Sequence, residues 1–187
     1  MNRIHKWYCR SAAWQRRVDT ELMPWALGDL ISEGPALEIG PGPGLTTDYL
    51  RAKVNSLTAL EADPMLAKQL RQKFSNTNVS VIGGDATAMP FDQGAFRTVY
   101  CFTMLHHVPS VALQDKLIDE VHRVLAPGGL FVGTDSRLSV RMQVFHWFDT
   151  MVIVDPSVFP QRLLAAGFTC PQIELGRGAF RFRAARC

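Results

Sequence analysis

Three glycines at alternate positions are the strongest chemical signal in this sequence. They lie in the run GPGPG at residues 40–44, directly after the short apolar segment 36–39 and directly before a helical pattern. Glycine allows tight turns and lets a ligand approach the main chain closely, because it has no Cβ. A strand that ends in such a loop, with a helix N-terminus beyond it, is typical of nucleotide-binding sites in open α/β sheets.

Carboxylates follow the next two predicted strands. The segment 56–60 predicts a second strand that ends at Glu61, about 20 residues after the glycines, where such folds hold a ribose by its two hydroxyls. The segment 79–82 predicts a third strand, and Asp85 follows it. Asp85 can accept a hydrogen bond from an exocyclic amine such as that of adenine.

Two histidines and an aspartate are the candidates for acid–base chemistry. His106 and His107 follow the predicted strand 98–102, and Asp135 follows the predicted strand 130–134. Ligands bind at the carboxyl ends of parallel strands, and these side chains could take a proton there. One histidine of an adjacent pair must point away from the pocket or cap the next helix. The sequence leaves open which of the two, if either, is a base.

Five motifs together make the chain resemble a known enzyme family. In order along residues 36–135 they read LEIGPGPG, LEADPML, GDATAMPF, FTMLHHV and RVLAPGGLFV. The chain resembles the class I S-adenosylmethionine-dependent methyltransferases, in particular their small-molecule branch. The resemblance implies methyl transfer to a small acceptor, with S-adenosylmethionine as the cofactor and S-adenosylhomocysteine as its product.

The resemblance also implies roles for individual residues. It implies that His106 or His107 takes the acceptor proton, and that Asp135 orients that histidine or binds the acceptor. We expect the buried carboxylate of Glu38 to bond to loop amides or to the cofactor's amino group, because an unpaired buried charge is costly. The cofactor-binding residues expected from the resemblance are Glu38, Gly40, Pro41, Gly42, Gly44, Glu61, Ala62, Asp85, Ala86, Phe102 and Thr103.

The elements that must position these residues alternate between strand and helix. Five strands and their helices over residues 36–135 predict an α/β fold with a parallel sheet and right-handed crossovers. Segments 172–175 and 179–184 predict a final hairpin that turns at residues 176–178. With the resemblance, this implies a Rossmann-like, doubly wound, mostly parallel seven-stranded sheet. Its last strand is antiparallel, and helices cover both faces.

We expect a single methyltransferase domain over residues 1–187. Within it we expect a helical cover at 1–33 (broken at Pro24), a cofactor-binding core at 34–135, a substrate-side connection at 136–155, and a helix with the terminal hairpin at 156–187. Aromatic residues of the cover and the connection suggest an apolar or aromatic acceptor, although ordinary core packing explains them equally well. They are Trp7, Tyr8, Trp14, Phe145, Trp147 and Phe148.

Composition and charge narrow the remaining choices. The chain is 47% hydrophobic with a net charge of +3, and its four cysteines lack metal-ligand spacing. We therefore expect no metal site and a cytoplasmic location. Residues 1–17 and 177–187 hold nine basic residues and no acidic one. These ends are either simply solvated or contact an anionic partner, such as a membrane surface on which the N-terminal helix could collect a lipid or quinone.

Three other functions fit the motifs less well. A nicotinamide dehydrogenase would explain neither Asp85 nor the LHHV segment, and the third glycine of its usual loop is missing. A nucleic-acid methyltransferase is disfavoured because the fourth strand ends in CFTM (residues 101–104), without the N/D-P-P-Y/F signature of base-amino methylation. A cofactor-binding interaction protein without catalytic activity remains an alternative.

Overall fold

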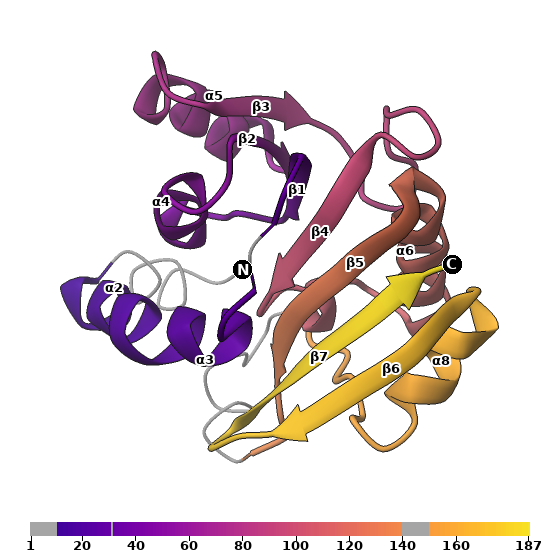
Figure 1. The fold of residues 1–187 in the computed structure, drawn as a ribbon. Coiled ribbons are helices and arrows are strands. Elements are labelled where there is room, and N and C mark those ends of the chain that lie inside the picture. Colours follow the sequence, from indigo (N-terminus) through magenta and orange to yellow (C-terminus); the bar gives the residue numbers. More distant parts are fainter. Residues whose placement is uncertain (1–10, 31, 140–149) are drawn as a thin grey trace.

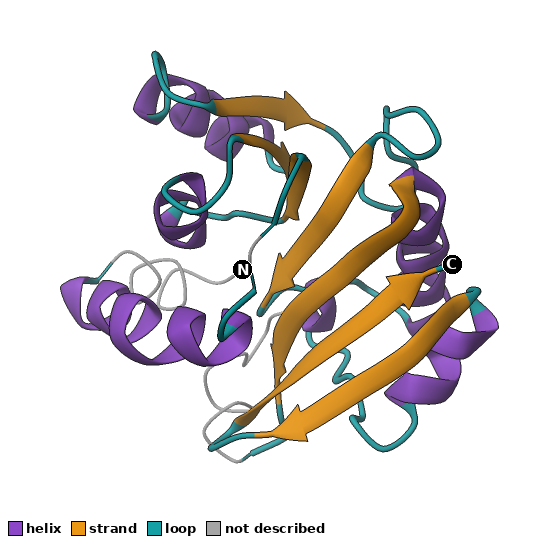
Figure 2. Ribbon diagram, viewed as in Figure 1, coloured by secondary structure: helices purple, strands orange, loops and turns teal. Residues whose placement is uncertain are grey.

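A computed structural model describes residues 11–30, 32–139 and 150–187 of the chain. These residues contain a seven-stranded sheet with the strand order β3-β2-β1-β4-β5-β7-β6 (Figures 1 and 2). The first five strands run parallel, and β7 lies antiparallel to both β5 and β6. The predicted fold class is confirmed. The strands are β1 (Pro35–Ile39), β2 (Ser56–Glu61), β3 (Val79–Gly83), β4 (Phe96–Phe102), β5 (Leu125–Ser136), β6 (Phe168–Leu175) and β7 (Ala179–Arg186).

Helices cover both faces of the sheet (Figure 2). Residues of α6 and α8 form one apolar core with the sheet, and residues of α3, α4 and α5 form the other. Adjacent residues of β5 contribute to different cores: Phe131 belongs to the first core and Val132 to the second. The helices are α2 (Ala12–Arg17), α3 (Met23–Leu27), α4 (Leu45–Arg51), α5 (Pro64–Lys73), α6 (Val111–Val124) and α8 (Phe159–Ala165), with a π-helix η1 (Val18–Leu22) and a 3-10 helix η2 (Leu105–His107).

Side-chain caps start the two helices that follow candidate site residues. The Asp63 carboxylate accepts hydrogen bonds from the amides of Met65 and Leu66, with Pro64 at the first helical position of α5. This is the arrangement that the sequence predicts. Ser110 caps α6 in the same way through the amide of Leu113. Both strand-to-helix connections are therefore held in place directly beside the carboxyl edge of the sheet.

The break expected at Pro24 takes a different form in the structure. The helical chain continues from α2 into α3 through η1, in which the amide of Met23 donates to the carbonyl of Val18. Pro24 has no N–H and cannot donate a helical hydrogen bond to the preceding turn. The wider turn of η1 accommodates the missing hydrogen bond. The part of the predicted cover at residues 1–10 lies outside the described residues. No helix within the described ranges is long and apolar enough to cross a membrane.

Gly133 lies in the middle of β5, where a side chain has no room. A Cβ at this position would overlap the carbonyl oxygen of Cys101 on β4 and lie 2.5 Å from the Phe182 ring on β7. We expect Gly133→Ala to lower the free energy of unfolding by about 3 kcal/mol, because the paired strands cannot separate without losing hydrogen bonds. Urea unfolding would measure the loss.

The matched control is Gly83→Ala at the end of β3. A Cβ there would meet only the far end of the Arg71 side chain, at 3.4 Å. We expect this variant to keep nearly the stability of the original chain. Equal stabilities of the two variants would contradict the packing argument for Gly133.

Candidate active site

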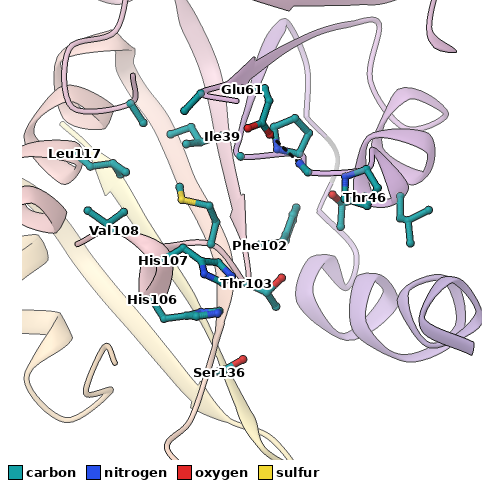
Figure 3. A pocket seen from close by; sticks show the side chains of 18 of the residues that line it. Ile39, Thr46, Glu61, Phe102, Thr103, His106, His107, Val108, Leu117 and Ser136 are labelled. Carbon is teal, nitrogen blue, oxygen red and sulfur yellow. Dashed lines mark hydrogen bonds between the residues drawn. The ribbon is translucent and has the colours of Figure 1, made fainter. Parts of the chain in front are cut away.

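A cavity of about 1180 Å³ lies at the carboxyl edge of the parallel strands (Figure 3). The loops after β1 to β5 line it, together with residues of α2 and the β6–β7 turn. Parallel strands all end at the same edge, so residues more than a hundred positions apart meet here. Pockets for drug-sized ligands have volumes of roughly 300–1,000 Å³, so this cavity has room for a ligand and a second reactant.

The glycine run forms one wall of the cavity. Gly40, Pro41 and Gly42 line it, and both of these glycines have positive φ angles, 64° and 56°. The Gly40 amide donates to the carbonyl of Leu60 at 2.9 Å, which ties the loop to the end of β2. A Cβ on Gly40 would overlap the Met104 side chain. The loop therefore needs glycine both for its backbone angles and for the space beside it.

Glu61 ends β2 and lies in the wall of the cavity (Figure 3). Its two carboxylate oxygens accept hydrogen bonds from the amides of Gly42, at 3.0 Å, and Asp63, at 2.9 Å. Burial raises the pKa of Glu61 above its ordinary value, and these amide hydrogen bonds partly oppose the rise. An ionised carboxylate has about four acceptor positions, so Glu61 retains capacity to accept hydrogen bonds from a ligand.

The loop after β3 supplies the next part of the wall. Asp85 and Ala86 line the cavity, as does Ala62 after β2. One carboxylate oxygen of Asp85 accepts a hydrogen bond from the amide of Thr87 at 2.8 Å, which fixes the turn of the loop. The sequence-predicted residues of the second and third strand ends are thus brought together at one side of the cavity.

Two residues of α6, neither of them predicted as a site residue, hold this loop in place. Glu120 accepts a hydrogen bond from the amide of Met89 at 2.7 Å, and Arg123 donates to the carbonyls of Met89 and Phe91. The hydrogen bond from Arg123, three residues further along the helix, lowers the pKa of Glu120. The spacing of Glu120 and Arg123, three residues apart on a helix, was visible in the sequence. Their contact with a loop about 30 residues earlier in the chain was not.

Phe102 and Thr103 lie at the centre of the cavity wall, at the end of β4 (Figure 3). Thr103 has a φ of 50°, and its amide donates to the carbonyl of Thr134 at 2.7 Å. A positive φ is unfavourable for a β-branched residue, and such backbone strain concentrates at functional sites. The chain therefore turns sharply here and runs directly into η2, which carries the two histidines.

In the structure, the side chain of His106 is hydrogen-bonded to that of Asp135. Its ring nitrogen Nδ1 lies 2.5 Å from a carboxylate oxygen of Asp135, and both side chains are almost fully buried. Asp135 also accepts hydrogen bonds from the backbone amides of His106 and Ser136. His106 lines the cavity, whereas Asp135 lies behind it. His107 lines the cavity as well, with the centre of its ring 4.1 Å from that of His106. The expectation that one of the two would point away or cap the next helix is wrong, because both lie on the single turn of η2 at the cavity and Ser110 caps α6.

Comparison with known proteins identifies the family. A sequence model described as "Methyltransferase domain" matches residues 37–133, just over half of the 187 residues. The chain belongs to the class I S-adenosylmethionine-dependent methyltransferases.

Individual relatives of this chain differ widely in the substrates that their names give. The chain is 31% identical over 103 residues to the sterol 4-C-methyltransferase strm-1 of Caenorhabditis elegans, covering 53% of this chain and 30% of that protein. It is 45% identical over 65 residues to the ribosomal RNA small subunit methyltransferase A of Koribacter versatilis, covering 34% and 22%. The chain thus spans less than a third of the length of either relative.

A solved structure shares the fold over nearly its whole length. The N-methyltransferase NodS of Bradyrhizobium japonicum, in complex with S-adenosylhomocysteine, matches with a TM-score of 0.73 and 18% identity. The match covers 96% of this chain and 91% of that one. At 18% identity, this comparison shows that the two chains share a fold.

The cofactor of this methyltransferase family is S-adenosylmethionine, and the cavity residues fit it. The Glu61 carboxylate lines the cavity and has acceptor capacity beyond its backbone hydrogen bonds, which suits the hydroxyls of a ribose. Gly40 and Gly42 line the cavity with positive φ angles and have no Cβ, so a ligand can lie close to the main chain of the loop. The cavity volume leaves room for an acceptor beside the cofactor.

Two of the expected cofactor residues do not line the cavity. A Cβ on Gly44 would meet Leu70 and Phe74, so this glycine allows close packing against α5. The Glu38 carboxylate lies beneath the loop, where it accepts hydrogen bonds from the hydroxyls of Thr46 and, at 2.6 Å, Thr47. The expected bonds to loop amides are therefore replaced by bonds to the first turn of α4. Both residues support the loop from behind.

Most of the predicted aromatic wall falls on segments that the structure does not describe. Trp14 lines the cavity from α2. The other five aromatic residues lie outside the described residues, namely Trp7, Tyr8, Phe145, Trp147 and Phe148.

Burial of Glu38 makes the stability of the chain depend on pH. Burial raises the pKa of this carboxyl from 4.5 to about 7, more than the threonine hydrogen bonds lower it. Between these values the folded chain keeps a proton that the unfolded chain releases, so stability falls as the pH rises through this range. We expect Glu38→Gln, which stays neutral, to remove this fall, which is worth roughly 3 kcal/mol.

Urea unfolding of both proteins across this pH range would measure the difference. The original chain is expected to lose stability from about pH 4.5 to about pH 7, while the variant changes less. Parallel pH dependences of the two proteins would show that Glu38 is not the group responsible.

Proposed function

We propose that this chain transfers a methyl group from S-adenosylmethionine to a small-molecule acceptor that lies beside His106. The observation that carries the proposal is one cavity lined both by Glu61 and by the histidine that is paired with Asp135. The cofactor would bind at the side of the cavity formed by the glycine loop and Glu61, and the acceptor would bind at the side of His106.

The proposed mechanism rests mainly on positioning. When bound, S-adenosylmethionine supplies a methyl group on an activated sulfonium, which an aligned nucleophile can attack. Glu61 would bind the ribose hydroxyls, and Asp85 would accept a hydrogen bond from the adenine amine. Asp135 would hold His106 through Nδ1, so that Nε2 is the atom that takes a proton from the acceptor. Asp135 would then stabilise the imidazolium.

The apolar part of the lining supports an acceptor with an apolar or aromatic body. Val108, Leu113 and Leu117 line the cavity on the side of η2 and α6, and Trp14 lines it from α2. These side chains would exclude water from the transfer and pack against the acceptor.

Methylation of RNA is the second candidate function. Its support is the identity to a ribosomal RNA methyltransferase, which covers 34% of this chain. The segment Cys101–Met104 at the end of β4 lacks the signature that base-amino methyltransferases carry at this place. We therefore favour the small-molecule acceptor.

Calorimetric titration with S-adenosylhomocysteine, and in parallel with NADH, tests the cofactor part of the proposal. We expect micromolar binding of the first compound alone. Binding of neither compound would contradict the cofactor part of the proposal, whereas binding of S-adenosylhomocysteine without turnover of any acceptor would favour the interaction protein without catalytic activity. Release of S-adenosylhomocysteine in the presence of quinones, phenols, lipids and RNA then tests the acceptor class, and turnover with RNA alone would contradict our preference.

A further inference from the structure

Charged residues of opposite sign line opposite parts of the cavity. Glu61 and Asp85 lie at the ends of β2 and β3, on one half of the sheet. Arg137 follows β5 and Arg177 lies in the β6–β7 turn, on the other half. The histidines after β4 lie between the two groups. In Figure 3, Glu61 and Ser136, which precedes Arg137, lie at opposite ends of the drawn site.

The two arginines lie on neighbouring loops. The amide of Arg137 donates to the carbonyl of Gly178 at 3.0 Å, and Gly178 directly follows Arg177. Arg17 lines the cavity from α2, but it lies 3.5 Å from Glu21, so this pair adds no net charge. Within the described ranges, the unpaired positive charge at the end of the cavity away from Glu61 therefore comes from Arg137 and Arg177.

Three other arginines of the hairpin have structural partners. Arg181 donates to the carbonyl of Trp25 and forms an ion pair with Glu174 at 2.5 Å, and Arg183 donates to the carbonyl of Leu27. Both thereby bind the C-terminal end of α3, where a positive charge is favourable. Arg186 donates to carbonyls at the end of α6 in the same way.

Arg137 and Arg177 have no such structural role among the described residues. Their side chains are exposed, line the cavity, and form no hydrogen bond or ion pair with any residue of the described ranges. Guanidinium groups bind carboxylates and phosphates by parallel hydrogen bonds, which makes arginine the usual residue for recognising these anions. The two arginines are thus available to a ligand of the cavity.

We propose that the acceptor is a small organic anion whose carboxylate or phosphate binds Arg137 and Arg177. This inference rests on the proposed methyl transfer and names the class of its substrate. The apolar body of the acceptor would pack against Leu113 and Leu117, and its nucleophile would lie near His106. A small anion is favoured over a polyanion because Arg181, Arg183 and Arg186 are bound within the fold and form no continuous basic face.

The test compares matched probes on the chain saturated with S-adenosylhomocysteine at low salt. Benzoate and phenyl phosphate carry the two candidate anions, and benzyl alcohol is their neutral counterpart. We expect at least one anion to bind about tenfold or more tightly than the alcohol, because it gains charge-assisted hydrogen bonds. The better of the two anions distinguishes a carboxylate from a phosphate acceptor.

Arginine variants show whether the preference arises at the proposed place. We expect the double variant R137Q/R177Q to lose the preference for anions while it keeps its affinity for S-adenosylhomocysteine. Arg16→Gln removes one positive charge from an exposed residue of α2 that does not line the cavity, and it is expected to keep the preference, as the single variants R137Q and R177Q are not.

Several outcomes would overturn the inference. Equal binding of the alcohol and both anions would do so, as would a preference that survives in the double variant. Binding of single-stranded RNA or of phosphatidylglycerol vesicles through these arginines, with neither small anion bound, would show a macromolecular partner. Failure to bind S-adenosylhomocysteine would instead contradict the proposed function itself, so the two failures are distinguishable.

Discussion

Asp135→Asn is expected to lower the rate of methyl transfer by about 10²- to 10⁴-fold, the usual contribution of a positioned base. The carboxylate of Asp135 accepts hydrogen bonds from His106 Nδ1 and from two backbone amides. Asparagine keeps only one oxygen, so its amide NH₂ group faces either the ring or a backbone donor. The imidazolium that forms during proton transfer then loses the adjacent negative charge that stabilises it.

The measurement is the turnover number with the acceptor that gives the fastest release of S-adenosylhomocysteine. A positioning role predicts a lower turnover number with an unchanged affinity for S-adenosylhomocysteine, whereas general damage to the fold would lower both. His106→Gln should match the loss. His107→Gln is the control, since Nδ1 of its neighbour His106 makes the contact with Asp135. Equal losses in both histidine variants would contradict the assignment of the base to His106.

Glu61→Ala is expected to weaken binding of S-adenosylhomocysteine by roughly 2–4 kcal/mol, through the loss of two charge-assisted hydrogen bonds. The truncation also removes the acceptor for the amides of Gly42 and Asp63, so the glycine loop loses its support. Because burial raises the pKa of Glu61, its ionised form is lost more readily on acidification. The affinity of the original chain should therefore fall as the pH is lowered.

Calorimetric titration measures this effect directly and requires no knowledge of the acceptor. Glu33→Ala is the matched control, because it removes an exposed glutamate that does not line the cavity. We expect the control to bind as tightly as the original chain. Unchanged affinity of Glu61→Ala would contradict the ribose assignment.

Local patterns in the sequence predicted most of the fold. Alternating strands and helices, the caps at Asp63 and Ser110, and the turn at residues 176–178 all depend on neighbouring residues. Such patterns give the order of the elements and therefore the edge at which the ligand residues gather. They do not give the path of a helix through a proline, which also depends on how the next turn packs. This is why η1 was not predicted.

The sequence by itself determined which chemical groups stand at the strand ends, and hence the carboxylates, glycines and histidines of the site. Only the tertiary structure decided which way these groups face. It placed Glu38 behind the loop, paired His106 with Asp135, and left Arg137 and Arg177 at the cavity. The reason is physical: a residue type and its strand are local properties, whereas hydrogen-bond partners come from segments far away along the chain.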